Sequence, residues 1–165
     1  MIRIALLSLI ALAACTAPGA TPADRAELST IKSRNIAPKL SPEDLVTAFQ
    51  RLCLNAPRDR AAHEAALRAA GYVPTGPGAT QVFLVDDKRP DIALTDTTCV
   101  ARATARTVQA AQAAAFIRQT YPNARDAQAA GLEHAWQTTQ GTIATRRAFE
   151  DGVNTYWLIL IRGSA

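Results

Sequence analysis

Hydrophobic residues between Leu45 and Cys53 recur at the spacing of one helical face, at positions i, i+1, i+4, i+7 and i+8. The preceding Ser41-Pro42-Glu43-Asp44 offers an N-cap, a proline at the first helical position and acidic residues in the first turn. A second helix is expected from about Asp59 to Ala70, with Gly71 as its C-terminal cap. The apolar face of this second helix is expected at Ala62, Ala66, Leu67 and Ala70.

The middle of the chain alternates between strand and turn patterns. Strands are expected at Gln81 to Asp86, at Cys99 to Ala105 and, as a shorter one, at Ile92 to Leu94, while Thr75 to Gly78 is expected to be a loop. A helix is then expected from Thr107 to Tyr121, ended by Pro122. Its apolar stripe is expected at Val108, Ala111, Ala115 and Ile117 or Phe116.

The last third of the chain predicts a meander of three antiparallel strands. These strands are expected at Leu132 to Thr138, Thr142 to Phe149 and Asn154 to Arg162, with turns at Gly141 and at Asp151-Gly152. Within the third strand, Tyr156 to Ile161 is apolar on both faces, which favours a central and covered position. The element order, roughly α-α-β-β-α-β-β-β, predicts an α+β fold with helices packed on a mainly antiparallel sheet.

The first fifteen residues have the order of a secretory signal. Arg3 is a positively charged start, Ile4 to Leu12 is an apolar run, and two small alanines precede Cys15. The apolar run is far shorter than the roughly 20 residues that a membrane-spanning helix needs. Residues 1–14 are therefore expected to be a signal peptide. Two explanations remain for Cys15: it has a role of its own, or it follows an ordinary secretory signal by chance.

Leu12-Ala13-Ala14-Cys15 resembles the lipobox of bacterial lipoproteins. The resemblance implies that the chain is cut before Cys15 and that the cysteine carries a lipid that holds it to a membrane. One acyl chain anchors a protein only marginally, whereas two or three anchor it stably. In Gram-negative lipoproteins an Asp after the lipidated cysteine marks retention in the inner membrane. Because Thr16 stands here, the resemblance favours the outer membrane, on the side facing the periplasm.

Residues 15–40 are expected to be the lipidated cysteine and a flexible tether, since prolines and a glycine interrupt them and no apolar period is sustained. A short helix within Ala23 to Ser33 is an option. A coil of about 25 residues spans roughly 25–30 Å root-mean-square. Residues 41–165 are then expected to form a single globular α+β domain.

The charge balance argues against a nucleic-acid partner. The net charge is +4, and with Arg3 removed 17 basic and 14 acidic residues leave +3. The basic residues are scattered, with no run longer than Arg146-Arg147, whereas a nucleic-acid-binding protein concentrates them on one face. The expected partners are the membrane, through the lipid on Cys15, and an envelope protein or a cell-wall component.

With Cys15 assigned to lipid, Cys53 and Cys99 remain as an even pair in an oxidising compartment. We expect them to form a disulfide, which would close a loop of about 47 residues and contribute roughly 4 kcal/mol in the chain-entropy model. Two buried free thiols or a catalytic thiol are the alternatives. Neither cysteine lies in a C-x-x-C or another nucleophile motif.

Motifs for catalysis, metals or cofactors are weak. His63 and His134 are the only histidines and lack the spacing of a metal site. His63 is expected to face solvent, and His134 to lie on the same strand face as Trp136. Four aspartates in one stretch could hold calcium, but turn chemistry is the better explanation of an acidic turn between strands; they are Asp86, Asp87, Asp91 and Asp96. No metal ligands, catalytic residues or cofactors are predicted.

Two function classes follow from these features. The first is a membrane-anchored envelope lipoprotein that acts as a non-catalytic binding or accessory module. It would use an aromatic patch or a shallow groove of arginine side chains. Arg146 and Arg147 are expected on opposite faces of their strand, so at least one could be presented to an acidic envelope component. The alternative, which is favoured, is that both arginines only keep the sheet soluble. The second class is a small envelope hydrolase with His63 or His134 as the general base.

Overall fold

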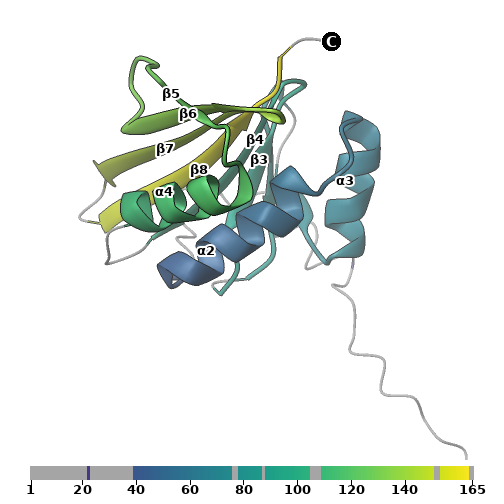
Figure 1. The fold of residues 1–165 in the computed structure, drawn as a ribbon. Coiled ribbons are helices and arrows are strands. Elements are labelled where there is room, and N and C mark those ends of the chain that lie inside the picture. Colours follow the sequence, from purple (N-terminus) through teal and green to yellow (C-terminus); the bar gives the residue numbers. More distant parts are fainter. Residues whose placement is uncertain are drawn as a thin grey trace, which may run out of the picture.

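The computed structural model describes residues 22, 39–75, 78–86, 88–104, 109–150 and 153–163. Within these residues, three α-helices pack against an eight-stranded antiparallel sheet, and the fold is therefore α+β, as predicted (Figure 1). The signal segment, Cys15 and most of the predicted tether lie outside the described residues. No helix among the described residues is both long and apolar enough to span a membrane.

The first helical segment begins where the sequence predicts. Helix α2 spans Pro42–Phe49, and the hydroxyl of Ser41 accepts a hydrogen bond from the backbone N–H of Asp44 at 3.1 Å. The segment continues as a wide π-helical turn, η2, over Gln50–Leu54. Because the sheet covers this turn and α3 packs beside it, its last three residues are all buried, as is most of the predicted helical face; these three are Leu52, Cys53 and Leu54.

Helix α3 spans Arg60–Ala69 and is capped by Asp59, whose carboxylate accepts from the N–H of Ala62 at 2.8 Å. Gly71 ends it with a φ of 90°, and the Tyr72 N–H donates to the carbonyl of Leu67 at 3.0 Å. The predicted alanine face is wrong: Leu67 is buried, but the buried residue one turn before it is His63, and the three alanines are exposed. Alanine adds little apolar area, so the larger side chains determine which face packs.

Helix α4 spans Gln109–Thr120 and connects β4 to β5. It buries Ala113 and Ile117, whereas Ala111 and Ala115 of the predicted stripe are exposed. Val108 lies outside the described residues. The stripe is therefore wrong in register except at Ile117, for the same reason as in α3.

The sheet has the strand order β1-β2-β3-β4-β8-β7-β6-β5. Two four-stranded meanders are thus joined through the central β4–β8 pair. The strands are β1 Val73–Thr75, β2 Gln81–Leu84, β3 Asp91–Leu94, β4 Thr98–Thr104, β5 Arg125–Ala127, β6 His134–Thr138, β7 Gly141–Glu150 and β8 Val153–Ile161. The predicted order lacks β1 and β5, and treats β3 as optional. Strands β1 and β5 lie at the two edges of the sheet and have three residues each. They are too short to show an alternating pattern, and only the neighbouring strand holds each of them in the sheet.

Strand β8 is central, as its two apolar faces predict. Its helix-side residues Tyr156, Leu158 and Leu160 are buried, and they pack with Leu45 and Phe49 of α2 in the core. The alternate residues of β8 face the other side of the sheet and are half-buried. The main core therefore lies between the sheet and the layer that contains α2 and α4 (Figure 1).

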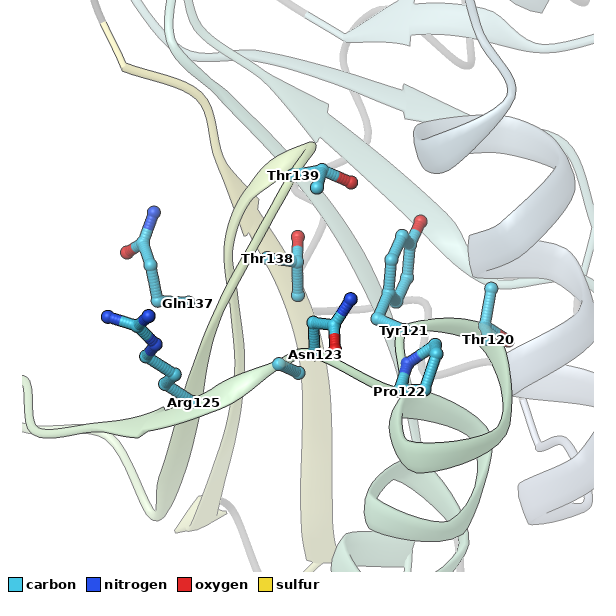
Figure 2. Close-up of a pocket in the computed structure, with 9 residues that line it drawn as sticks. Thr120, Tyr121, Pro122, Asn123, Arg125, Gln137, Thr138 and Thr139 are labelled. Carbon is cyan, nitrogen blue, oxygen red and sulfur yellow. The ribbon is translucent and has the colours of Figure 1, made fainter.

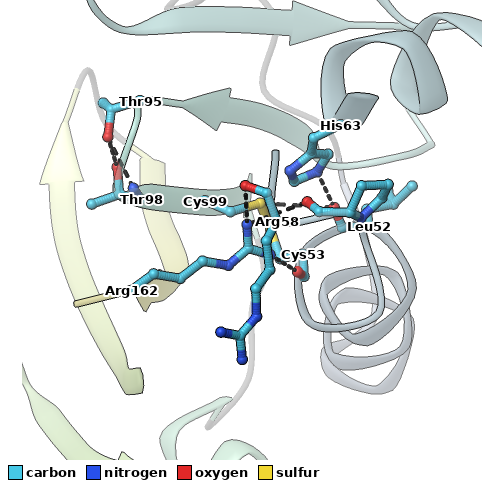
Figure 3. Close-up of a disulfide and its surroundings, with 9 residues drawn as sticks. Leu52, Cys53, Arg58, His63, Thr95, Thr98, Cys99 and Arg162 are labelled. Carbon is cyan, nitrogen blue, oxygen red and sulfur yellow. Dashed lines mark hydrogen bonds between the residues drawn. A yellow bond between two sulfur atoms is a disulfide. The ribbon is translucent and has the colours of Figure 1, made fainter. Parts of the chain in front are cut away.

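Cys53 and Cys99 form a disulfide, with their Cα atoms 5.6 Å apart. The bond joins the π-helical turn to the start of the central strand β4 (Figure 3). Both residues are fully buried. The disulfide that the cysteine count predicts therefore crosslinks the helical layer to the sheet.

Candidate functional site

His63 is part of the core and does not face solvent, so its predicted position is wrong. The residue is 3% exposed, and its Nε2 lies 2.7 Å from the carbonyl oxygen of Leu52, to which it donates a hydrogen bond (Figure 3). Burial lowers the pKa of His63. The Leu52 carbonyl lies at the end of a helical segment, where carbonyls lack a partner within the helix. His63 supplies that partner and has a structural role.

Arg162 satisfies carbonyls at the same helix end. Its Nη2 donates to the carbonyl oxygen of Cys53 at 2.9 Å, and its Nη1 donates to that of Pro57 at 3.3 Å (Figure 3). Because Arg162 follows the last residue of β8, these bonds join the end of the sheet to the helical layer. The residues around the disulfide therefore have a structural role, since they hold the helical layer to the end of the sheet.

The aspartates considered for calcium are dispersed among separate arginines. Asp86 pairs with Arg89 at 2.8 Å, Asp96 pairs with Arg60 at 2.7 Å, and the nearly buried Asp91 pairs with Arg102 across strands β3 and β4; Asp87 lies outside the described residues. Burial raises the pKa of Asp91 to about 6, although Arg102 acts in the opposite direction. The described residues contain no cluster of three or more side chains suited to a metal.

A groove with a mixed polar and apolar lining opens where α4 meets strands β5 and β6. Helix α4 ends at Thr120, where Pro122 prevents its continuation, and the N–H of Ala124 donates to the carbonyl of Tyr121 at 2.9 Å before β5 begins. Two adjoining cavities, of about 380 Å³ and about 210 Å³, share Tyr121, Pro122 and Ala124. We call them together the Tyr121 groove.

Tyr121 lies at the centre of this groove. Figure 2 shows its ring beside Thr138 and Asn123, with Thr139 at the turn above it. Partial burial raises the pKa of Tyr121, so the hydroxyl stays protonated and can donate a hydrogen bond. In the smaller cavity Tyr121 is joined by Arg118, Asp126 and Trp136. Among the described residues, the ion pairs involve neither Arg118 nor Asp126, and both are exposed.

The rim of the groove continues around the β5–β6 ribbon. Arg125 and Gln137 are paired across these strands and point together to the side away from Tyr121 (Figure 2). The side-chain oxygen of Gln137 accepts from the hydroxyl of Thr142 at 2.8 Å, which leaves its amide N–H groups free to donate. The groove therefore offers aromatic, amide, hydroxyl and charged groups around one open surface.

His134 lies further along β6. It is exposed, and its ring stacks on that of Trp136 with centroids 6.0 Å apart, so the two share a face as predicted. It lines a third hollow, of about 380 Å³, together with Glu133. Arg147 lies 4.0 Å from Glu133 on this side of the sheet. Of the two histidines, only His134 is open to a ligand.

Arg146 and Arg147 lie on opposite faces of β7, as predicted. Arg146 lies over the ring of Trp157 at 5.0 Å, on the side away from α2 and α4, whereas Arg147 lies near Glu133. The guanidinium of Arg146 is thus held by a cation–π contact within the protein.

The sequence analysis did not identify Tyr121, Asn123 or Arg118 as candidate binding residues. Their only sequence signal is the helix end at Tyr121-Pro122, because the surface forms from segments that meet only in the fold. Comparisons of the chain with protein-family models, with curated proteins and with solved structures found no match.

Proposed function

We propose that this protein is a lipoprotein of the bacterial cell envelope, held by lipid on Cys15, whose domain binds an envelope component without chemical conversion. The anchor is supported by the run Leu12-Ala13-Ala14-Cys15 behind a charged and apolar start. The localisation that goes with it is the periplasmic side of the outer membrane.

The binding role is carried by one observation, the Tyr121 groove. Its lining is built on a helix end and two strands, so its groups are held by regular structure. Tyr121, Asn123 and Thr139 present polar groups beside an aromatic ring, in a cavity of a size suited to a small molecule or to part of a larger partner. The hydroxyl and amide groups of the lining can exchange hydrogen bonds with a partner, and its apolar atoms can pack against that partner.

The anchor is tested by fractionating cells that carry Cys15→Ala. We expect this variant to leave the membrane fraction and to appear among soluble periplasmic proteins. If it resists a high-salt wash in the membrane fraction as the parent does, the lipid anchor is wrong.

The groove is tested by placing a photoreactive side chain at Asn123, with the exposed Arg51 on η2 as a matched control position. We expect an adduct from Asn123 in intact cells, lost when Tyr121→Ala is added, and none from Arg51. Equal adducts at the two positions would remove the groove from the proposal.

The alternative function is a hydrolase that uses His134 as the general base, and it is supported by the exposure of His134 beside Glu133. His63 is unsuited to this role because its Nε2 is bound to the Leu52 carbonyl in the core. Purified protein and the His134→Ala variant are incubated with isolated envelope material. Soluble fragments released by the parent and not by the variant would favour the hydrolase.

A further inference from the structure

We infer that Phe149, at the hairpin end of strand β7, contacts the lipid surface, and that the Tyr121 groove is thereby held at the far end of the sheet. The inference rests on the proposed lipid anchor. It adds an orientation for the domain and a membrane contact apart from the anchor itself.

The chain enters the domain at one end of the sheet. Lys39 forms a parallel bridge with Thr104, the last residue of β4, and the N–H of Leu40 donates to the Thr104 carbonyl at 3.3 Å. Residues 16–38 separate this point from Cys15. As a coil these 23 residues would span roughly 25–30 Å, which leaves the entry end within reach of the bilayer.

Strand register places Phe149 at the same end. Thr104 is paired with Thr155 of β8, and Thr155 is paired with Ala148 of β7. With strands about 4.8 Å apart, the row from Lys39 to Ala148 is about 15 Å wide. Phe149 is the next residue towards the hairpin, opposite Asn154. The hairpin end and the chain entry therefore face the same way.

Phe149 differs from the other large apolar side chains that the structure describes. Phe149 is 71% exposed, whereas every other large hydrophobic side chain that the structure describes is buried or half-buried. Arg147, two residues earlier on the same strand face, is also exposed, and its guanidinium lies 4.0 Å from the Glu133 carboxylate. An aromatic ring with a nearby cation is the combination found where proteins meet the headgroup region of a bilayer.

One phenylalanine binds a membrane weakly, but the lipid anchor raises the effective concentration of Phe149 at the membrane surface. A short flexible linker gives a tethered group an effective concentration in the millimolar range, so a weak contact becomes populated. Glu43 and Asp44 lie in the first turn of α2 directly after the chain entry, and Glu150 and Asp151 follow Phe149 in the sequence, so this end carries both signs of charge. Ring insertion, and not adsorption by net charge, is therefore expected to make the contact.

The groove lies at the opposite end of the sheet. Strand β7 runs from Gly141, beside the turn that carries Thr139, to Glu150 at the hairpin, and Figure 1 shows the two ends on opposite sides of the sheet. Nine steps of about 3.3 Å separate them by about 30 Å. A domain that rests on its hairpin end presents the Tyr121 groove away from the membrane.

The test uses the full lipoprotein in vesicles of phosphatidylethanolamine and phosphatidylglycerol. Cys53 and Cys99 are bonded and the Cys15 thiol would carry lipid, so one added cysteine is the only free thiol. An environment-sensitive fluorophore is placed at Asn154→Cys, beside Phe149, or at Thr139→Cys, at the groove end; both positions are exposed. Lipids that carry a quencher in the acyl chain report contact.

We expect severalfold stronger quenching at position 154 than at position 139, and a fall to the level of position 139 when Phe149→Ser is added. Equal quenching at both positions overturns the inference. Quenching at position 154 that stays the same when Phe149→Ser is added also overturns it. Flotation with the vesicles is measured first. Failure to float overturns the anchor and the inference together, whereas flotation without differential quenching overturns only the orientation.

Discussion

Gly141 lies so close to Ile161 in the sheet that a Cβ atom built on it would stand 2.3 Å from the Ile161 carbonyl oxygen. Gly141 also has a φ of 128°, a conformation that side chains disfavour. The site combines both constraints at the turn that leads from β6 into β7, next to the Tyr121 groove.

Gly141→Ala is expected to lower the free energy of unfolding by about 3 kcal/mol, because the backbone of Ile161 has to move and the φ remains strained. Gly131 is a matched control, since its φ is also positive, at 78°, but nothing lies within 4 Å of its Cβ position. Gly131→Ala is expected to cost about 1 kcal/mol. Urea denaturation of both variants measures the difference, and equal losses would contradict it.

His63→Ala is expected to lower the free energy of unfolding by about 2 kcal/mol, because the Leu52 carbonyl loses its buried donor. His63→Gln keeps a donor and is expected to lose less. Since burial lowers the pKa of His63 below 6.5, the unfolded chain takes up a proton that the folded chain resists. The stability from this group is present above pH 6.5 and is lost as the pH falls.

Thermal unfolding between pH 7.5 and pH 5.5 tests this sign. The parent is expected to lose stability over that interval more steeply than His63→Gln. Parallel profiles for the two proteins would show that His63 does not titrate between the folded and unfolded states.

Asp91 is expected to change stability with pH in the opposite sense to His63. Burial raises its pKa from 3.8 to about 6, so the folded protein binds a proton more tightly than the unfolded chain. Its contribution is most favourable below pH 3.8 and diminishes as the pH rises to about 6. Asp91→Asn is expected to remove that part of the pH profile of stability.

The disulfide is expected to stabilise the domain by about 4 kcal/mol, since it joins residues 46 positions apart in the sequence. The double variant Cys53→Ala, Cys99→Ala is therefore expected to unfold at lower urea. Cys15→Ala is the matched control, because it removes a cysteine outside the domain, and its midpoint should equal that of the parent. The fluorescence of the buried Trp136 reports unfolding.

Local signals in the sequence determined much of the fold. Ser41 begins the first helix and Gly71 ends the second, because caps act through hydrogen bonds and backbone angles within a few residues. The central position of β8 follows from two apolar faces, which are stable only in the interior of a sheet. The even cysteine pair predicted the crosslink, because Cys15 had a separate assignment.

Tertiary structure decided the edge strands and the direction of His63. Strands β1 and β5 have three residues each and exist through their ladders to β2 and β6. His63 points into the core because its Nε2 donates to the carbonyl of Leu52, eleven residues earlier. That carbonyl lies at the end of a helical segment and has no partner within the helix. Neither relation appears in the local pattern, since each depends on a partner that only the folded chain brings near.

The candidate sites divide in the same way. Cys15 is a prediction of the sequence alone, since a signal of this kind is recognised along an extended chain before folding. The Tyr121 groove and the position of Phe149 follow from the meeting of α4 with β6 and from the register of β7 on β8. The sequence specifies these surfaces only through non-local packing and strand pairing, whose partners lie tens of residues apart.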